Sequence, residues 1–221
     1  MTFAPRGRAA AAVGLVLLVA FAVSAHLAIV GGSLDPSIGA SLSLVPIAGL
    51  AFWAVRQSRR QQTALAAAGT AVVALWIGWP ELERHFPGVF FIEHAGANVL
   101  LAIAFGRTLV GNREALCTRF ARLVHGTLPA EVERYTRRVT LAWAVFFAAV
   151  FVLSCLLYLG GFLAAWSLLA NILSPLLVAG MFVVEYLVRH RVLPQWERTG
   201  ILGGIRAFTR HFGAAQPEAP R

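Results

Sequence analysis

VTLAWAVFFAAVFVLSCLLYL, residues 139–159, is a run of 21 residues without a charged side chain. At a rise of about 1.5 Å per residue, a helix of this length crosses the roughly 30 Å hydrocarbon core of a bilayer. The run therefore predicts a transmembrane helix.

The whole chain is as apolar as this run suggests. Hydrophobic residues make up 58% of the 221 residues, charged residues only 13%, and the mean hydropathy is +0.72. This composition predicts an all-α, polytopic membrane protein in which residues 1–221 form one integral membrane domain. The expected transmembrane helices are Ala9–Val30, Ile38–Val55, Ala64–Trp79, Gly88–Phe105, Val139–Leu159 and Trp166–Val188.

The first expected helix also has features of a cleaved secretory signal. Arg6 and Arg8 precede the apolar run, and VSA at residues 23–25 is a small-residue stretch typical of cleavage sites. Apolar sequence continues through HLAIV, however, which makes the run too long for a signal peptide. We expect a retained helix.

The distribution of the arginines predicts how the chain is oriented in the membrane. They account for all nineteen basic residues, since the chain contains no lysine. Six helices with a cytoplasmic N-terminus put eighteen arginines on the cytoplasmic side and leave only Arg84 outside. Loops rich in positive charge stay in the cytoplasm, and an incorrect helix count would destroy this asymmetry. The sequence therefore predicts six helices with both termini in the cytoplasm, including a basic tail over residues 189–221.

FIEHAGANVL, residues 91–100, places three polar residues inside an expected span: Glu93, His94 and Asn98. Ionisable side chains at this depth are costly unless they face protein or water. His94 and Asn98 lie four apart and share a helix face, and His26 comes to a similar depth on the first helix. With Asn171, these residues are the predicted intramembrane polar site. Packing residues, a pocket for protons or substrate, and a metal site all remain open readings, although no metal-ligand spacing supports the last.

Asn171, Ser174 and Pro175 in NILSPLLV interrupt the last expected span. Proline lacks a backbone N–H, so it frees a carbonyl group in the preceding turn. We expect a local break in that helix, with the freed carbonyl bonded by a neighbouring helix.

Residues 106–138 form the longest polar segment, expected to be a cytoplasmic loop. Leu116, Phe120, Leu123 and Val124 recur at helical spacing, which predicts an amphipathic helix from Arg113, capped by Asn112 and ended by Gly126. A second helix, capped by Thr127, should run directly into the span at 139–159. The arginines of this segment are the predicted site for a partner or for anionic lipid headgroups: Arg107, Arg113, Arg119, Arg122, Arg137 and Arg138. Nucleic acid is not expected, because no recognition module accompanies them.

Residues 86–194 resemble a family of uncharacterised bacterial inner-membrane proteins encoded beside fatty-acid-synthase-like genes, including aryl polyene clusters. The most specific part of the resemblance is the run FGRTLVGNREALCTRFARLVHGTLPAEVERYTRRVTLAWAVFF. The resemblance implies a bacterial inner membrane and a pathway that builds acyl or polyene lipids on acidic acyl carrier proteins. It implies no catalytic residues and no cofactor.

Three functions fit these features. No nucleophile elbow, phosphate-binding loop or CxxC pair occurs in the sequence, so neither a catalytic residue nor a cofactor is predicted. An accessory or scaffold protein that docks acyl carrier protein or synthase enzymes on the arginines is the preferred function. A lipid or polyene exporter that uses the intramembrane polar site is the alternative, and an intramembrane acyltransferase fits least well.

Overall fold

A computed structural model describes residues 5–31 and 35–193, with side chains from residue 12 onward. Every regular element in these ranges is helical, in agreement with the predicted all-α class. Five helices are long and apolar enough to cross a membrane, and Gln61–Ile77 is a shorter apolar helix. The side chains of Arg6 and Arg8, and the predicted tail beyond residue 193, lie outside the described part.

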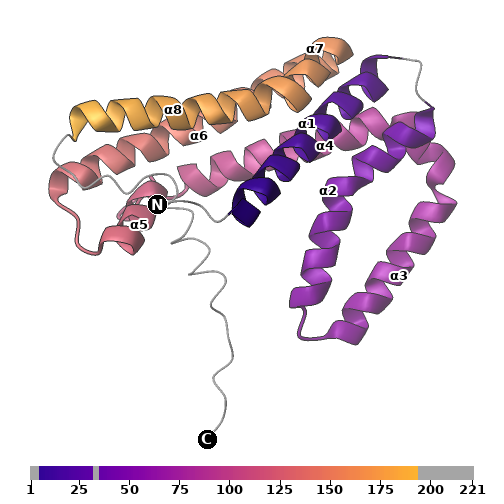
Figure 1. Cartoon of the computed structure of the whole chain (residues 1–221), viewed down its shortest axis with the longest axis horizontal. Helices are drawn as coiled ribbons and strands as arrows, with labels where there is room; N and C mark the ends of the chain where they lie inside the picture. The colour runs from indigo at the N-terminus through magenta and orange to yellow at the C-terminus, as the bar shows by residue number, and fades with distance from the viewer. Residues whose placement is uncertain (1–4, 32–34, 194–221) are drawn as a thin grey trace, which may run out of the picture. The chain divides into compact units, whose positions relative to one another are not determined.

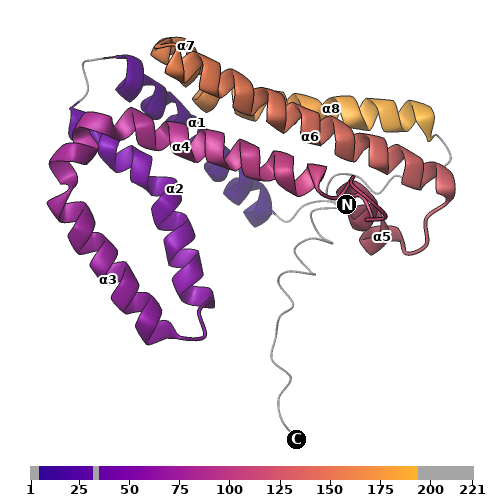
Figure 2. The ribbon, with the colours of Figure 1, turned by 180° about the vertical axis from the view of Figure 1, so that it is seen from behind.

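The first half of the chain forms four helices, drawn in Figures 1 and 2: α1 Pro5–Val30, α2 Pro36–Gln57, α3 Gln61–Ile77 and α4 Trp79–Gly106. Asp35 caps α2 by accepting a 2.9 Å hydrogen bond from the Ser37 backbone N–H, which lowers the pKa of this exposed carboxyl. Helices α2 and α3 run antiparallel as a hairpin (Figure 1).

The prediction that residues 80–87 form a loop between the third and fourth spans is wrong, because these residues are helical. Only Gly78 separates α3 from α4. Pro80 suits the first turn of a helix, where its missing N–H costs nothing, and Glu81 complements the positive end of the helix dipole. Helix α4 continues through Pro87 and so is longer than predicted.

The second half contains α5 Leu116–His125, α6 Ala130–Leu159, α7 Leu163–Ser167, the π-helix η1 Leu168–Leu173 and α8 Ser174–Val192. The predicted continuous helix from the loop into the span at 139–159 is confirmed as α6. The predicted start of α5 is wrong, because Ala115 rather than Asn112 occupies the N-cap. Gly126, at a φ of 77°, ends α5 as predicted.

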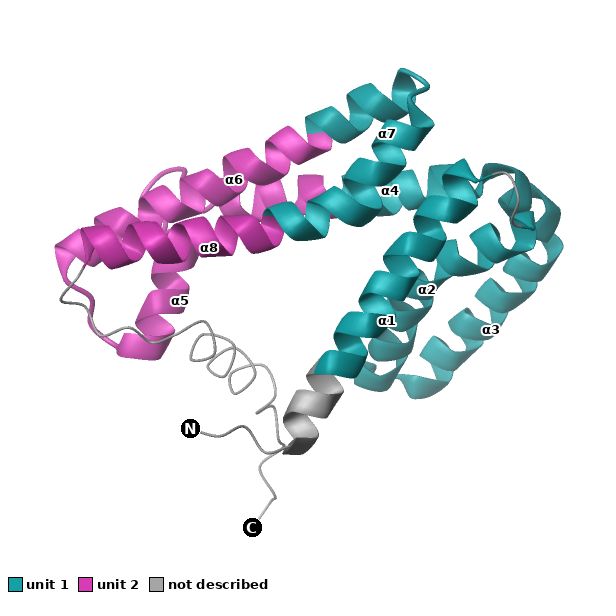
Figure 3. Cartoon of the chain, turned by 45° about the horizontal axis from the view of Figure 1, so that its top comes forward, with its two compact units in different colours: residues 1–96, 152–177 teal, residues 97–151, 178–221 magenta. Residues whose placement is uncertain are grey.

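The described chain divides into two compact units, coloured in Figure 3. Unit 1 comprises Met1–Gly96 and Val152–Leu177, and unit 2 comprises Ala97–Phe151 and Val178–Arg221. The boundary falls inside α4, α6 and α8, so each of these helices contributes to both units.

The core of unit 1 joins helices that are far apart in the sequence. Ala25 on α1, Ala40 on α2, Phe86 and Phe90 on α4, and Trp166 on α7 are all buried together. By contrast, α3 has no buried residue. In a membrane protein such an apolar helix surface is compatible with contact to lipid.

Unit 2 has an aromatic core. Trp143 on α6 lies against Phe105, Phe147 and Phe182, with ring centroids 6.2, 5.4 and 4.9 Å away. Trp143 and Phe147 are buried. These contacts hold α4, α6 and α8 together within unit 2.

We expect Gly39→Ala to destabilise unit 1, because a Cβ at Gly39 would lie 2.6 Å from the Phe86 ring. Overpacking of this kind costs about 1–3 kcal/mol, more than the helix propensity that alanine adds. Thermal unfolding in detergent measures the effect. Gly49→Ala on the same helix is the control, since nothing lies within 4 Å of a Cβ there. Equal stability of the two variants would contradict the described packing of α2 on α4.

Candidate functional site

His94, in the middle of α4, lies between two serine side chains of unit 1. Its Nδ1 is 3.1 Å from Ser154 Oγ on α6, and its Nε2 is 3.0 Å from Ser174 Oγ at the start of α8. Ser154 is fully buried and also accepts a 2.9 Å hydrogen bond from Trp166 Nε1. His94 therefore ties three helical segments together through polar contacts.

The partners of Ser174 define the proton positions in this network. Ser174 Oγ lies 2.8 Å from the Leu169 carbonyl oxygen, which can only accept, so the serine hydroxyl donates there. Ser174 Oγ consequently accepts from His94 Nε2–H. In a neutral imidazole the other nitrogen then accepts, so Ser154 donates to His94 Nδ1 and accepts from Trp166. We call this set of bonds the His94 network.

A second group of contacts connects His26 with Asn171 through Ser167. His26 Nδ1 lies 3.0 Å from Ser167 Oγ, and Asn171 Nδ2 donates to the Oγ and the carbonyl oxygen of Ser167 at 3.2 and 3.1 Å. Ser167 is fully buried. Two of the predicted site residues thus meet at a serine that follows Trp166 directly in the chain.

The predicted break in the last span is confirmed, and it is a π-helix. In η1 the Ser174 backbone N–H reaches the Leu169 carbonyl, five residues back. The carbonyls of Ser167 and Leu169 also accept from Asn171 Nδ2 and Ser174 Oγ. These two carbonyls are bonded by side chains of the same helical segment. The expected bond from a neighbouring helix to the carbonyl group that Pro175 leaves free stays a prediction.

Glu93 and Asn98 are placed differently from the histidines. Glu93 is partly buried, and its Oε1 is shielded from solvent with no hydrogen-bond partner among the described residues. Asn98 is buried and belongs to unit 2. The five predicted residues of the intramembrane polar site are therefore distributed over two serine-centred networks, the Glu93 side chain and unit 2.

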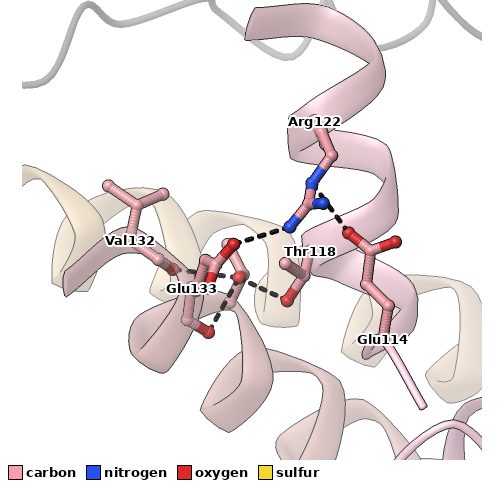
Figure 4. A network of polar contacts seen from close by, with 6 residues as sticks. Glu114, Thr118, Arg122, Val132 and Glu133 are labelled. Carbon is pink, nitrogen blue, oxygen red and sulfur yellow. Dashed lines mark hydrogen bonds and ion pairs between the residues drawn. The ribbon is translucent and has the colours of Figure 1, made fainter. Parts of the chain in front are cut away.

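Helix α5 is docked on α6 by one arginine and a pair of threonines, as Figure 4 shows. Arg122 contacts Glu133 at 2.6 Å and Glu114 at 3.0 Å. Thr118 Oγ1 lies 2.7 Å from Thr136 Oγ1, and both threonines are buried. Arg122, predicted as a binding residue, thus bridges two glutamates of unit 2.

Two other arginines of the loop bind backbone carbonyls near the end of α4. Arg137 Nη2 donates to Leu109 O at 2.7 Å, and Arg113 Nη1 lies 3.5 Å from Arg107 O. Cationic groups at this position complement the negative end of the helix dipole. The side chains of Arg107, Arg119 and Arg138 are exposed and make no ion pair with any described residue.

A polar group on α8 has its partners within unit 2. Glu185 Oε1 lies 3.5 Å from Arg189 Nε and accepts a 3.3 Å hydrogen bond from the Tyr135 hydroxyl. Glu185 thus pairs with an arginine one turn further along its own helix. Nearby, Cys117 donates its backbone N–H to Thr140 Oγ1, and burial raises the pKa of the Cys117 thiol. Cys117 and Cys155 are both free.

Sequence reasoning missed the serines that organise the intramembrane site. Ser154 and Ser167 read as small residues in apolar runs, and their importance depends on His94 and His26, which are distant in sequence. The only available signal was the presence of a hydroxyl inside an uncharged span. Within the described ranges, no group of three or more histidine, cysteine or acidic side chains could hold a metal ion.

Comparisons of the chain with protein-family models, with curated proteins and with solved structures find no match. The resemblance noted for residues 86–194 therefore stays a prediction.

Replacing Ser154 by alanine should destabilise unit 1. The change would leave Trp166 Nε1 without its acceptor and His94 Nδ1 without its donor in a buried setting, at a cost of about 1–3 kcal/mol for each unsatisfied group. A lower unfolding temperature in detergent is the expected result. Ser41→Ala serves as the control, because Ser41 is exposed and bonds only to the Ser37 carbonyl of its own helix. An unchanged unfolding temperature for Ser154→Ala would contradict the His94 network.

Proposed function

We propose that this chain is an accessory protein of the bacterial inner membrane that docks acidic soluble partners on cytoplasmic arginines. One observation carries the proposal: Arg122 takes up two of the three acidic residues of the loop, Glu114 and Glu133. Glu131 is the remaining acid. No described ion pair joins Glu131 or any other carboxylate to the remaining arginines of the loop.

The proposed docking surface consists of Arg107, Arg113, Arg119, Arg137 and Arg138, and we refer to it as the arginine surface. All five side chains are exposed. Positive charge that is not neutralised within the protein attracts acidic partners from a distance and favours their correct orientation. A binding role for these five residues is consistent with a separate, structural role for Arg122.

Acyl carrier protein and the synthase enzymes that use it are the proposed partners. The resemblance of residues 86–194 implies a pathway of this kind, and acyl carrier proteins are acidic. Anionic membrane lipids are a second class of ligand for the same guanidinium groups. A docking experiment must therefore exclude lipid.

The proposed topology has six transmembrane helices, with α3 as the third and both termini in the cytoplasm. Helix α3 has 17 residues and a length of about 26 Å, slightly shorter than the hydrocarbon core, and a thinner local bilayer accommodates such a difference at modest cost. Without α3 as a span, the arginine surface and the N-terminus would lie on opposite sides of the membrane. The positive-inside rule favours the six-helix arrangement.

Cysteine labelling tests this topology. In a background lacking Cys117 and Cys155, a cysteine at Arg84 should react from outside with a membrane-impermeant thiol reagent, whereas one at Gln61 should react only after permeabilisation. Both positions are exposed, so accessibility within the protein does not distinguish them. Reaction of the Gln61 cysteine in intact cells would contradict six spans.

Export of a lipid-like product is the second candidate function, favoured by the polar groups of unit 1. His26, His94 and Glu93 lie in apolar helices, and η1 interrupts the segment that contacts both histidines. π-Helical turns are frequent at functional sites. An exporter predicts that product is still made, and accumulates inside, when these side chains are changed.

An intramembrane acyltransferase is the least supported candidate. It would need a serine or histidine that can reach an acyl group. Ser154 and Ser167 are fully buried, and each hydroxyl oxygen already accepts a hydrogen bond from a side-chain N–H. Their burial keeps an acyl group away from both hydroxyl oxygens.

Charge reversal at Arg119 and Arg138 should release the acidic partner. Association steered by charge weakens with salt, because the Debye length falls from about 10 Å at 0.1 M to about 3 Å at 1 M. We expect purified wild-type protein in lipid-free detergent to capture, at low salt, the acyl carrier protein whose gene lies beside its own. Arg119→Glu with Arg138→Glu should lose this capture, and product synthesis should stop in cells.

The matched control reverses Arg59 and Arg60, which lie in the connection between α2 and α3 on the same proposed side of the membrane. It changes the net charge equally and should retain capture. If wild-type protein captures neither carrier protein nor synthase enzymes at low salt, the docking function is wrong. Equal loss in the control would show that net charge alone is responsible.

A further inference from the structure

Glu93 has an unusual environment for an acidic residue in an apolar helix. It follows His85 by eight residues and precedes Arg107 by fourteen, distances of about 12 and 21 Å along α4. These two cations are separated by about 33 Å, close to the thickness of the hydrocarbon core. The Glu93 carboxyl therefore lies well inside the membrane-spanning part of α4.

No cation is available to Glu93 in the described part of unit 1. Arg84 and His85 both pair with Glu81, and Arg56 lies 4.6 Å from the centre of the Phe52 ring. The two histidines of the spans contact serines, and no ion pair or hydrogen bond joins Arg59 or Arg60 to Glu93. The cations of unit 1 that have described contacts make them with groups other than Glu93.

The other acids of α4 differ in this respect. Glu83 Oε1 accepts two hydrogen bonds of 2.6 Å, from Ser37 Oγ and Trp79 Nε1. Glu81 has its two cationic partners in solvent. Donors of this kind stabilise a carboxylate. Glu93 Oε1, by contrast, is shielded from solvent and has no described donor.

The remaining titratable groups of unit 1 do not change this comparison. Helix α3 and the segment of residues 163–177 contain none, α1 contributes only His26 from residue 12 onward, and the unit 1 part of α6 has Cys155 and Tyr158. Neither a thiol nor a phenol supplies positive charge. Among the described residues, an ionised Glu93 would thus have no cation beside it, and a lone negative charge in hydrocarbon is strongly unfavourable.

We infer that Glu93 is a neutral carboxylic acid in the resting protein, so that unit 1 contains an intramembrane proton-binding site. The bound ligand is one proton, carried on the carboxyl group of Glu93. This inference is independent of docking at the arginine surface, which lies in unit 2. For the export function it would supply a group whose charge changes when the proton leaves.

A hydrophobic carbodiimide tests the protonation state directly. The carboxyl O–H adds across one C=N bond of the reagent, forming a C–O bond and an N–H bond without a leaving group. Migration of the acyl group from oxygen to nitrogen then gives a stable N-acylurea that carries the whole mass of the reagent. Ionised carboxylates react far less, and the reagent partitions into the apolar phase.

Full-length protein in detergent micelles or liposomes at neutral pH should be treated with dicyclohexylcarbodiimide, and the modified peptide identified by mass spectrometry. We expect modification at Glu93 and its loss in Glu93→Gln. A water-soluble carbodiimide should not modify Glu93, and Glu83→Gln should leave the modification of Glu93 unchanged.

Absence of modification at Glu93 in wild-type protein would overturn the inference, as would equal modification by the water-soluble reagent. Since glutamine has nearly the same shape as the neutral acid, Glu93→Gln should also unfold at nearly the wild-type temperature. If that variant fails to fold, peptide mapping of the wild-type protein still decides the question.

Discussion

Hydrocarbon offers no hydrogen bonds, and this constraint shapes unit 1. A polar group in an apolar helix has to find its partner inside the protein. His94 satisfies both ring nitrogens with serines from two other helical segments, and the directions of these bonds follow from the single hydroxyl proton on each serine. Since each member of the His94 network restricts the next, the helices it joins are held in one register.

The loop of residues 107–138 meets the opposite condition, an excess of charge where water is available. Arg122 takes up Glu114 and Glu133, while Arg113 and Arg137 bind backbone carbonyls. Exposed ion pairs contribute little stability each, about 0–1 kcal/mol. The buried threonine pair under α5 is therefore an important part of how the loop keeps its shape, while the guanidinium groups of Arg107, Arg119 and Arg138 stay exposed.

The sequence predicted the helices well where their cause is local. Long uncharged runs identified α1, α2 and α6, and Gly126 identified the end of α5, because apolar length and positive φ are properties of short stretches. Residues 80–87 were misjudged as a loop. Pro87 suggested a boundary, yet Pro80 and Glu81 favour the helix start at Trp79, nine residues before the predicted start at Gly88. The cap of α5 was misplaced because Asn112 is one polar residue among several in that loop.

The candidate site was harder to predict, because its contacts are long-range. His26, His94 and Asn171 were recognisable as polar residues in apolar helices. The serine that His26 contacts lies 141 residues away in the chain, and the two serines that His94 contacts lie 60 and 80 residues away. Only the serine partner of Asn171 is local, at 4 residues. Which arginine forms ion pairs was equally hidden, since Arg122 and Arg119 have similar sequence surroundings. Both are exposed, but Glu114 and Glu133 contact Arg122, and no described ion pair involves Arg119.

The π-helix η1 has a consequence for the spacing of residues in the chain. A π-turn holds one more residue than an α-turn, and each residue of an α-helix turns the chain by about 100°. A π-turn accommodates its extra residue within a single turn, so the segments on either side keep the phase that an α-helix one residue shorter would give them. If Leu168–Leu173 kept all its residues and formed α-turns instead, Ser174 would be rotated by about 100° relative to Ser167, and His26 and His94 could not both keep their serines. The π-turn thus sets the phase between the two histidine contacts.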